Sequence, residues 1–165
     1  MTPKEARQGT ARPRARVDRV PPHDWIIRSA TPADLPRVLE LWKTAGVPPG
    51  VSDTRAGLSS LLANDADALL VAEADGTMVG SLIATWDGWR GSFYRLAVEP
   101  SRRREGIGTA LLRAGERRLS DRGALRLTAI VTEDDALAGA FWVSAGYEQQ
   151  PNRVRFLRHL DRPEG

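Results

Sequence analysis

A basic, glycine-containing loop between two apolar segments is the feature that most limits the folds open to this chain. The segment Arg103-Arg104-Glu105-Gly106-Ile107-Gly108 follows an apolar run at residues 93–98 and opens an amphipathic run at 106–122. This order predicts a strand, a loop and a helix. Glycine lets a backbone approach a ligand closely, and the first helical turn presents unpaired N–H groups at the positive end of the helix dipole. The loop therefore predicts a site for a di- or pyrophosphate.

Two familiar phosphate-binding loops do not fit these residues. The ATP/GTP loop requires a lysine followed by serine or threonine, and no lysine follows Gly106 or Gly108. The dinucleotide fingerprint requires a third glycine, but Leu111 occupies that position. A plain strand–turn–helix connection with solvated arginines remains the structural alternative.

The remaining pattern, Arg103-x-x-Gly106-x-Gly108 with Pro100 ahead of it, resembles the acetyl-CoA loop of the GNAT superfamily of N-acetyltransferases. A second match is the end of the last predicted helix, Phe141-Trp142-Val143-Ser144-Ala145-Gly146-Tyr147. The resemblance covers residues 25–160 and is closest to small single-domain bacterial members. It implies an α/β fold with a mixed, mostly antiparallel central sheet of about six to seven strands, flanked by about four helices.

The resemblance also implies where acetyl-CoA would bind. In the family, two neighbouring strands separate and the pantetheine arm lies between them, with the last residues of the cofactor strand as backbone partners. The Val98 N–H would also face the thioester oxygen, where a fixed donor stabilises the transition state. Carried onto this sequence, the cofactor-binding residues are Leu96, Ala97, Val98, Arg103, Arg104, Glu105, Gly106, Ile107, Gly108, Thr109, Asp135 and Trp142. No metal is expected, because there is no cysteine and the two histidines, His23 and His159, are too few and too far apart in sequence to suggest a metal site.

The resemblance assigns the residues for proton transfer less well than the residues that bind the cofactor. Many family members protonate the leaving CoA with a tyrosine of the last helix, but Trp142 occupies that position, and an indole N–H is not a usable acid. Tyr147 and Tyr94 are the neighbouring phenols, and protonation by solvent stays open. An alkylamine has a pKa of about 10.4, so a base is also needed. The candidate bases are Glu133, Asp134 and Asp87, for which turn capping is the alternative role.

The predicted activity is direct transfer of acetyl from acetyl-CoA to a primary amine on a small molecule or a protein. The alternative is a non-catalytic acyl-CoA sensor or partner module, which the tryptophan at position 142 motivates. The acidic residues near the predicted acceptor side favour a cationic amine.

Further elements are predicted around this centre. Strands are expected at 25–28, 68–74, 78–85, 125–131, 147–150 and 154–160, besides the cofactor strand. Helices are expected from Thr31 to Gly46, around Leu58–Leu62, and at 134–145. Asp75-Gly76 is a strong hairpin signal. Trp42, Val47 and Val51 are candidates to line the acceptor site, with a core role as the alternative for Trp42.

Charge and composition limit the remaining possibilities. Residues 1–24 hold six basic and three acidic side chains, while the remainder balances 18 basic against 18 acidic side chains. We therefore expect a basic, disordered extension at 1–24 and one acetyltransferase domain at 25–165, with no nucleic-acid binding by the domain. The extension could direct the enzyme to RNA, or be merely solvated. There is no cysteine, which excludes an acyl-cysteine intermediate. No apolar run suits a membrane span or secretion signal, so the cytoplasm is expected; exposed closing strands would suit a homodimer.

Overall fold

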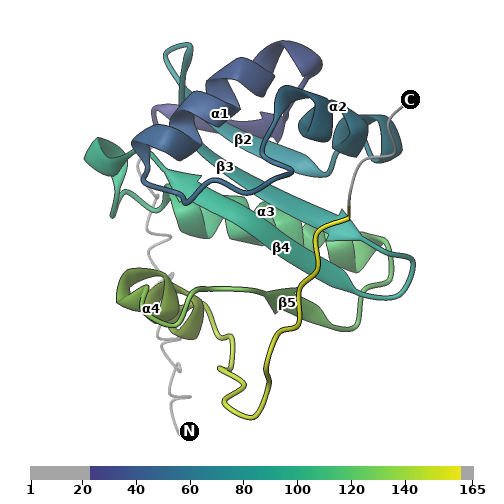
Figure 1. The fold of residues 1–165 in the computed structure, drawn as a ribbon. Helices are drawn as coiled ribbons and strands as arrows, with labels where there is room; N and C mark the ends of the chain where they lie inside the picture. The colour runs from purple at the N-terminus through teal and green to yellow at the C-terminus, as the bar shows by residue number, and fades with distance from the viewer. Residues whose placement is uncertain (1–22, 161–165) are drawn as a thin grey trace, which may run out of the picture.

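A single sheet forms the centre of the fold (Figure 1). The computed structural model describes residues 23–160, so most of the predicted extension lies outside the described residues. Five strands lie across the sheet in sequence order. The first four are antiparallel, and the last pairs in parallel with the fourth. They are β1 Trp25–Ser29, β2 Leu69–Ala74, β3 Thr77–Trp86, β4 Gly91–Val98 and β5 Leu127–Ala129.

Helices cover both faces of this sheet. Helices α1 (Leu35–Thr44) and α2 (Arg55–Asn64) pack on one face, and α3 (Ile107–Asp121) packs on the other. Helix α4 (Ala136–Ser144) follows β5 and lies beside the β5 edge (Figure 1). Successive side chains of a strand point to opposite faces. In β2, accordingly, Leu69 and Val71 belong to the α1–α2 core, whereas Leu70 and Ala72 belong to the α3 core.

The predicted α/β class, with a mixed sheet and four helices, is confirmed, and the hairpin at Asp75-Gly76 is present. These two residues have φ angles of 47° and 75°, as the two central residues of a type I′ turn require. Gly46 also has the predicted role of ending α1, with a φ of 75°.

The predicted number of strands is too high, because the two closing strands are absent from the described residues. Neither residues 147–150 nor 154–160 form a strand. Side chains with the apolar pattern of a strand, such as Val154 and Phe156, are 81% and 93% exposed. A strand needs a neighbour to pair with, and the outermost strand on this side, β5, is only three residues long. The pattern alone therefore overestimates the sheet.

Two glycines allow α3 to lie close to the sheet. A Cβ atom on Gly80 of β3 would lie 2.8 Å from Ile107 Cγ2, and a Cβ atom on Gly115 of α3 would lie 2.9 Å from Phe93 Cε1. Larger residues at either position would push the helix away. Because α3 begins at the basic loop, this close packing also determines where the N-terminus of α3 lies relative to β4.

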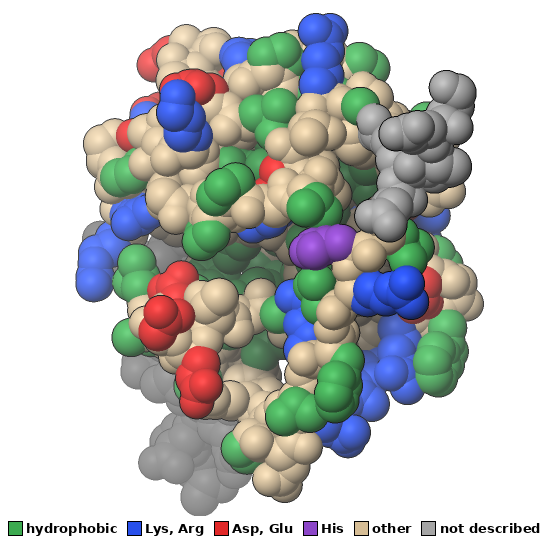
Figure 2. Space-filling model, viewed as in Figure 1, with side chains coloured by type: hydrophobic (Ala, Val, Ile, Leu, Met, Phe, Trp, Pro, Cys, Tyr) green, Lys and Arg blue, Asp and Glu red, His purple; other side chains and the backbone are tan. Residues whose placement is uncertain are grey.

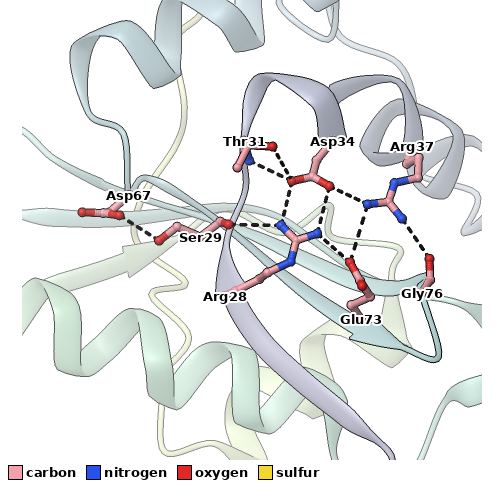
Figure 3. Close-up of polar contacts among 8 residues, drawn as sticks. All are labelled: Arg28, Ser29, Thr31, Asp34, Arg37, Asp67, Glu73 and Gly76. Carbon is pink, nitrogen blue, oxygen red and sulfur yellow. Dashed lines mark hydrogen bonds and ion pairs between the residues drawn. The ribbon is translucent and has the colours of Figure 1, made fainter.

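A network of ion pairs joins the start of α1 to the first two strands (Figure 3). Asp34 is 2% exposed, and its carboxylate accepts hydrogen bonds from Arg28 at 2.7 and 2.9 Å and from Arg37 at 2.6 Å. The Arg28 guanidinium also donates to Glu73 on β2 at 2.5 Å. The hydrogen bond from Arg28 is the largest of the contacts that lower the pKa of Asp34 well below its usual range.

None of the helices described between residues 23 and 160 has the length and apolar character that a membrane span requires.

Candidate acetyl-donor cleft

The cleft opens where β4 and β5 part. The two strands pair only from Gly91 with Leu127 to Phe93 with Ala129. Strand β4 then continues to Val98, whereas β5 ends, and a cleft of about 890 Å³ lies between them. Figure 2 shows a recess between the side of α1 and the side of α4, with hydrophobic side chains inside it. The lining comes from the loop after α1, residues 93–98, the basic loop, residues 130–132 and α4.

A bulge in β4 borders this cleft. Ile83 of β3 pairs with Tyr94, but Ser81 pairs with Ala97, so β4 has one residue more than β3 over this stretch. Arg95 in the bulge has a φ of 53°, in the left-handed region that non-glycine residues avoid. Its carbonyl oxygen accepts a hydrogen bond from Ser81 Oγ at 3.4 Å, and Ser81 accepts one from Trp42 Nε1 at 2.8 Å. A fully buried polar pair thus supports the bulge from the α1 side.

Beyond the bulge, the hydrogen-bond pattern turns the Val98 N–H toward the cleft. The next residue, Glu99, donates its N–H to the carbonyl of Val79 at 2.9 Å, while Val98 is opposite Gly80. Residues of an antiparallel strand alternate between bonding and not bonding to one neighbour. The N–H of Val98 therefore points away from β3, toward the side from which β5 has separated.

The N-terminus of α3 lies at one end of the cleft. Gly106 precedes the helix with a φ of 85°, and its carbonyl accepts the first helical hydrogen bond, from Ala110. The N–H groups of Ile107, Gly108 and Thr109 consequently have no acceptor within the helix. All three residues line the cleft, so this end offers a row of N–H donors at the positive end of a 15-residue helix.

The three arginines before α3 have different partners. Arg102 forms ion pairs with Glu105 and Asp24, both at 2.8 Å, and the hydrogen bond to Glu105 is the largest cause that raises its pKa. Arg103 donates to the Ala45 carbonyl at the end of α1, at 3.2 Å. Arg104 lines the cleft and has no ion-pair partner among the described residues. Arg103 and Arg104 are therefore the two arginines whose positive charge no described carboxylate neutralises at the α3 end of the cleft.

Most of the residues predicted to bind the cofactor lie together around the cleft. Glu105 is the exception: it does not line the cleft and pairs with Arg102 instead. Those that line it are Leu96, Ala97, Val98, Arg103, Arg104, Gly106, Ile107, Gly108, Thr109, Asp135 and Trp142. Asp135 also begins α4, where its carboxylate accepts the Ala138 N–H at 2.9 Å.

The side chains predicted to be catalytic do not themselves line the cleft. Glu133 and Asp134 are exposed in the turn between the lining residues Thr132 and Asp135, and Figure 2 shows acidic side chains beside the recess on the side of α4. Asp87 lies in the turn before β4, where hydrogen bonds from the backbone of Arg90 and Trp89 lower its pKa.

Tyr147 does not line the cleft either. Its hydroxyl donates to Glu116 of α3 at 2.9 Å, and burial, together with this bond, raises its pKa above the ordinary value. It belongs to an aromatic cluster with Trp142 and Phe93, at ring distances of 4.9 Å from Trp142 and 6.3 Å from Phe93. This cluster packs the chain around α4 against β4.

The structure adds residues to the cleft that were not among the predicted cofactor-binding residues. Tyr94, one of the two phenols considered for proton transfer, lines the cleft with 43% of its surface exposed, and Arg95 lines it from the bulge. Of the three candidates for the acceptor side, Val47 in the loop after α1 lines the cleft, Trp42 is buried in the core, and Val51 does not line the cleft. The position of an arginine at positive φ has no signal in a sequence, because arginine has no preference for that conformation.

Comparisons with known proteins place this architecture in a family. The profile of the Acetyltransferase (GNAT) family matches residues 35–147. An acetyltransferase of Yersinia pestis (strain Pestoides F) is 34% identical over 117 residues, covering 71% of this chain and 83% of that protein. Ard1 from Thermoplasma volcanium has a similar fold, with a TM-score of 0.68 and 22% identity over 75% of this chain and 82% of its own.

A second solved structure carries a ligand. The PaiA N-acetyltransferase from Thermoplasma acidophilum, in complex with coenzyme A, has a TM-score of 0.67 and 18% identity, covering 76% of this chain and 91% of its own. Both structural likenesses concern the fold, and the sequence matches supply the family. The chain therefore belongs to the GNAT family of acetyltransferases.

Proposed function

We propose that the cleft binds acetyl-CoA and transfers its acetyl group directly to a primary amine. The observation that carries the proposal is the parting of β4 from β5 beside the N-terminus of α3. The gap offers the backbone of β4 to an extended arm, and the helix end offers N–H donors to a pyrophosphate. The coenzyme A complex of the similarly folded PaiA enzyme supports this choice of donor.

The residues of the cleft suit each part of the donor. Ile107, Gly108 and Thr109 would hold the pyrophosphate through their N–H groups, with Arg103 and Arg104 adding charge and forked hydrogen bonds. The pantetheine arm would lie along Leu96–Val98. The thioester oxygen would then meet the Val98 N–H.

The reaction begins with attack of the amine nitrogen on the thioester carbon. The carbonyl oxygen becomes an oxyanion, which the Val98 N–H stabilises as the charge develops. Collapse of this intermediate breaks the C–S bond and releases CoA as a thiolate, while the nitrogen loses a proton. Glu133 and Asp134, next to the lining residues Thr132 and Asp135, are the carboxylates to test as base, directly or through water. Among the described residues that line the cleft, Tyr94 is the one tyrosine, and we propose that its hydroxyl donates the proton to the thiolate.

Calorimetry with a matched glycine pair tests donor binding. Gly106 and Gly76 have φ angles of 85° and 75°, and neither has an atom within 4 Å of an added Cβ. Both positions are in the left-handed region, so the two substitutions to aspartate strain the backbone to a similar degree and differ mainly in where the new charge lies. Gly106→Asp places a negative charge at the proposed pyrophosphate site and should abolish acetyl-CoA binding, whereas Gly76→Asp in the β2–β3 turn should bind like the wild type. Equal affinities in all three proteins would contradict the proposed site.

A panel of amines then tests the transfer. Wild-type protein should release free thiol from acetyl-CoA only when an acceptor amine is present, and Glu133→Gln should lower this rate without changing acetyl-CoA affinity if Glu133 is the base. Tight binding with no thiol release from any amine would favour an acyl-CoA sensor instead.

A further inference from the structure

Arg95 connects the β4 bulge to the loop between α1 and α2. Its Nε donates to Asp53 Oδ1 at 3.1 Å, and its Nη2 lies 2.6 Å from Asp53 Oδ2. Its Nη1 donates to the Pro48 carbonyl at 3.1 Å. One guanidinium therefore holds both the middle and the end of a loop that is more than 40 residues away in sequence. Both side chains are mostly buried, at 26% exposure for Arg95 and 12% for Asp53.

The same contacts give the α1–α2 loop its shape. The Gly50 N–H donates to Asp53 Oδ2 at 2.7 Å, so Asp53 also closes the turn from Gly50 to Asp53. An added Cβ on Gly50 would lie 2.6 Å from Arg95 Nη2, which shows how closely the loop backbone covers the guanidinium. Val47 and Pro48 of this loop line the cleft. The position of that wall therefore depends on the ion pair between Arg95 and Asp53.

The other end of Arg95 is the strained backbone of the bulge. Left-handed φ costs a non-glycine residue roughly 1–2 kcal/mol, so the conformation must be held by its surroundings. Ser81 holds the Arg95 carbonyl and Asp53 holds its side chain. The bulge lies three residues before Val98, and the extra residue determines which N–H groups of β4 turn toward the cleft.

We propose that Arg95 is a positioning residue whose pairing with Asp53 couples the α1–α2 wall of the acceptor side to the oxyanion-binding strand. The inference rests on the proposed acetyl transfer, because it concerns how the acceptor is aligned with the thioester. The forked guanidinium matters here, since three donors on one planar group reach two different parts of the loop. Lysine could supply the charge but not this geometry.

Three substitutions break the coupling in different ways. Asp53→Asn removes the negative charge, and Arg95→Lys keeps the positive charge but removes the fork. Gly50→Ala keeps both charges and displaces the guanidinium sterically. The matched control is Asp65→Asn at the opposite end of α2. The Asp65 carboxylate binds Arg118 of α3 and Arg122 just after α3, and Asp65 does not line the cleft.

The expected readout is a larger change in the handling of the acceptor than of the donor. The Asp53, Arg95 and Gly50 variants should raise the acceptor KM by about tenfold and lower kcat. The loss of affinity for acetyl-CoA, measured by calorimetry, should be smaller, because only the pantetheine-binding part of the donor site, Leu96–Val98, adjoins the bulge. Arg95→Lys should have the smallest effect of the three, because part of the ion pair remains. Asp65→Asn should lose stability but keep its acceptor KM. Equal acceptor KM values in the Asp53, Arg95 and Gly50 variants and the wild type would overturn the proposal.

Hydrogen exchange at the bulge separates this inference from the proposed function. Amides of Tyr94–Val98 should exchange faster in Asp53→Asn and Gly50→Ala than in Asp65→Asn, with or without turnover. If the wild type acetylates no amine, the proposed function fails, and the exchange rates still decide whether Asp53 holds the bulge. Unchanged exchange in the Asp53 and Gly50 variants would refute the coupling even if the enzyme is active.

Discussion

The Tyr147 hydroxyl donates a hydrogen bond to Glu116 Oε1 at 2.9 Å and so ties the chain after α4 to α3. Glu116 also pairs with Arg113 at 2.6 Å, and Arg113 donates to the carbonyl of Ala145 at 3.2 Å. These contacts connect α4 to the middle of α3 at two points. Because α4 lines the cleft, they help to determine the position of one cleft wall.

This bond predicts that Tyr147→Phe affects stability more than chemistry. Removing the hydroxyl leaves the Glu116 carboxylate without that donor, and we expect the free energy of unfolding to fall by about 1 kcal/mol. Turnover of bound substrates should stay close to that of the wild type, because the phenol does not line the cleft. Urea unfolding and kcat measured on the same preparation check both expectations. A large loss of kcat with unchanged stability would instead identify Tyr147 as the acid.

Tyr94 leads to the opposite prediction. Its side chain lines the cleft just before the bulge, and we expect Tyr94→Phe to lower kcat about 100-fold, the usual contribution of a general acid. Acetyl-CoA affinity should be unchanged, since the substitution removes only an oxygen atom. Steady-state thiol release and calorimetry measure the two quantities. Unchanged kcat would show that solvent protonates the departing thiolate.

The buried carboxylate of Asp34 predicts a dependence of stability on pH. Its pKa is lowered in the folded protein, chiefly by Arg28, so its contribution is complete above the unfolded pKa of about 3.9 and declines as the pH falls below it. Asp34→Asn should cost about 3 kcal/mol at pH 7, because two arginines lose their partner. The difference from the wild type should be constant from pH 6 to 8 and shrink below about pH 4.

Chemical unfolding across this pH range tests the prediction. The control is Glu40→Gln, which removes an exposed carboxylate 3.9 Å from Lys43 and should change stability by less than about 0.5 kcal/mol. A constant difference down to pH 3 would show that the Asp34 pKa is not lowered.

Two helical glycines predict opposite effects of the same substitution. In α3, Gly115→Ala brings a Cβ within 2.9 Å of Phe93 and 3.1 Å of Leu82, and overpacking should cost about 2 kcal/mol. In α4, an added Cβ on Gly139 meets nothing within 4 Å, so Gly139→Ala should gain up to about 1 kcal/mol from helix propensity. Thermal unfolding should show a lower Tm for Gly115→Ala and an equal or higher Tm for Gly139→Ala than for the wild type. Similar shifts in Tm would mean that α3 does not depend on this close approach.

Several elements were predictable because neighbouring residues encode them. The strand, basic loop and helix around Gly106 follow from local backbone preferences, as does the turn at Asp75-Gly76, and both are present. The family resemblance rested on the same local pattern, and the profile match confirms it. The residues expected to bind the donor come together because most of them belong to one strand and the helix that follows it.

The pairing of distant segments was not predictable in this way. Residues 154–160 were predicted to form a closing strand, but a strand forms only where a neighbour offers free backbone groups. Similarly, Tyr147 suggested an acid by its closeness in sequence to the last helix, while its partner, Glu116, lies 31 residues earlier.

The sequence by itself therefore determined the class of fold, the family and the loop expected to bind phosphate, because each depends on residues within a few positions of one another. Only the tertiary structure decided the length of the sheet, the bulge at Arg95 and the partner that holds it. The ion pair between Arg95 and Asp53 joins residues 42 positions apart. Its formation depends on how α1, α2 and β4 pack together, and that packing results from burial spread over the whole core rather than from any local motif.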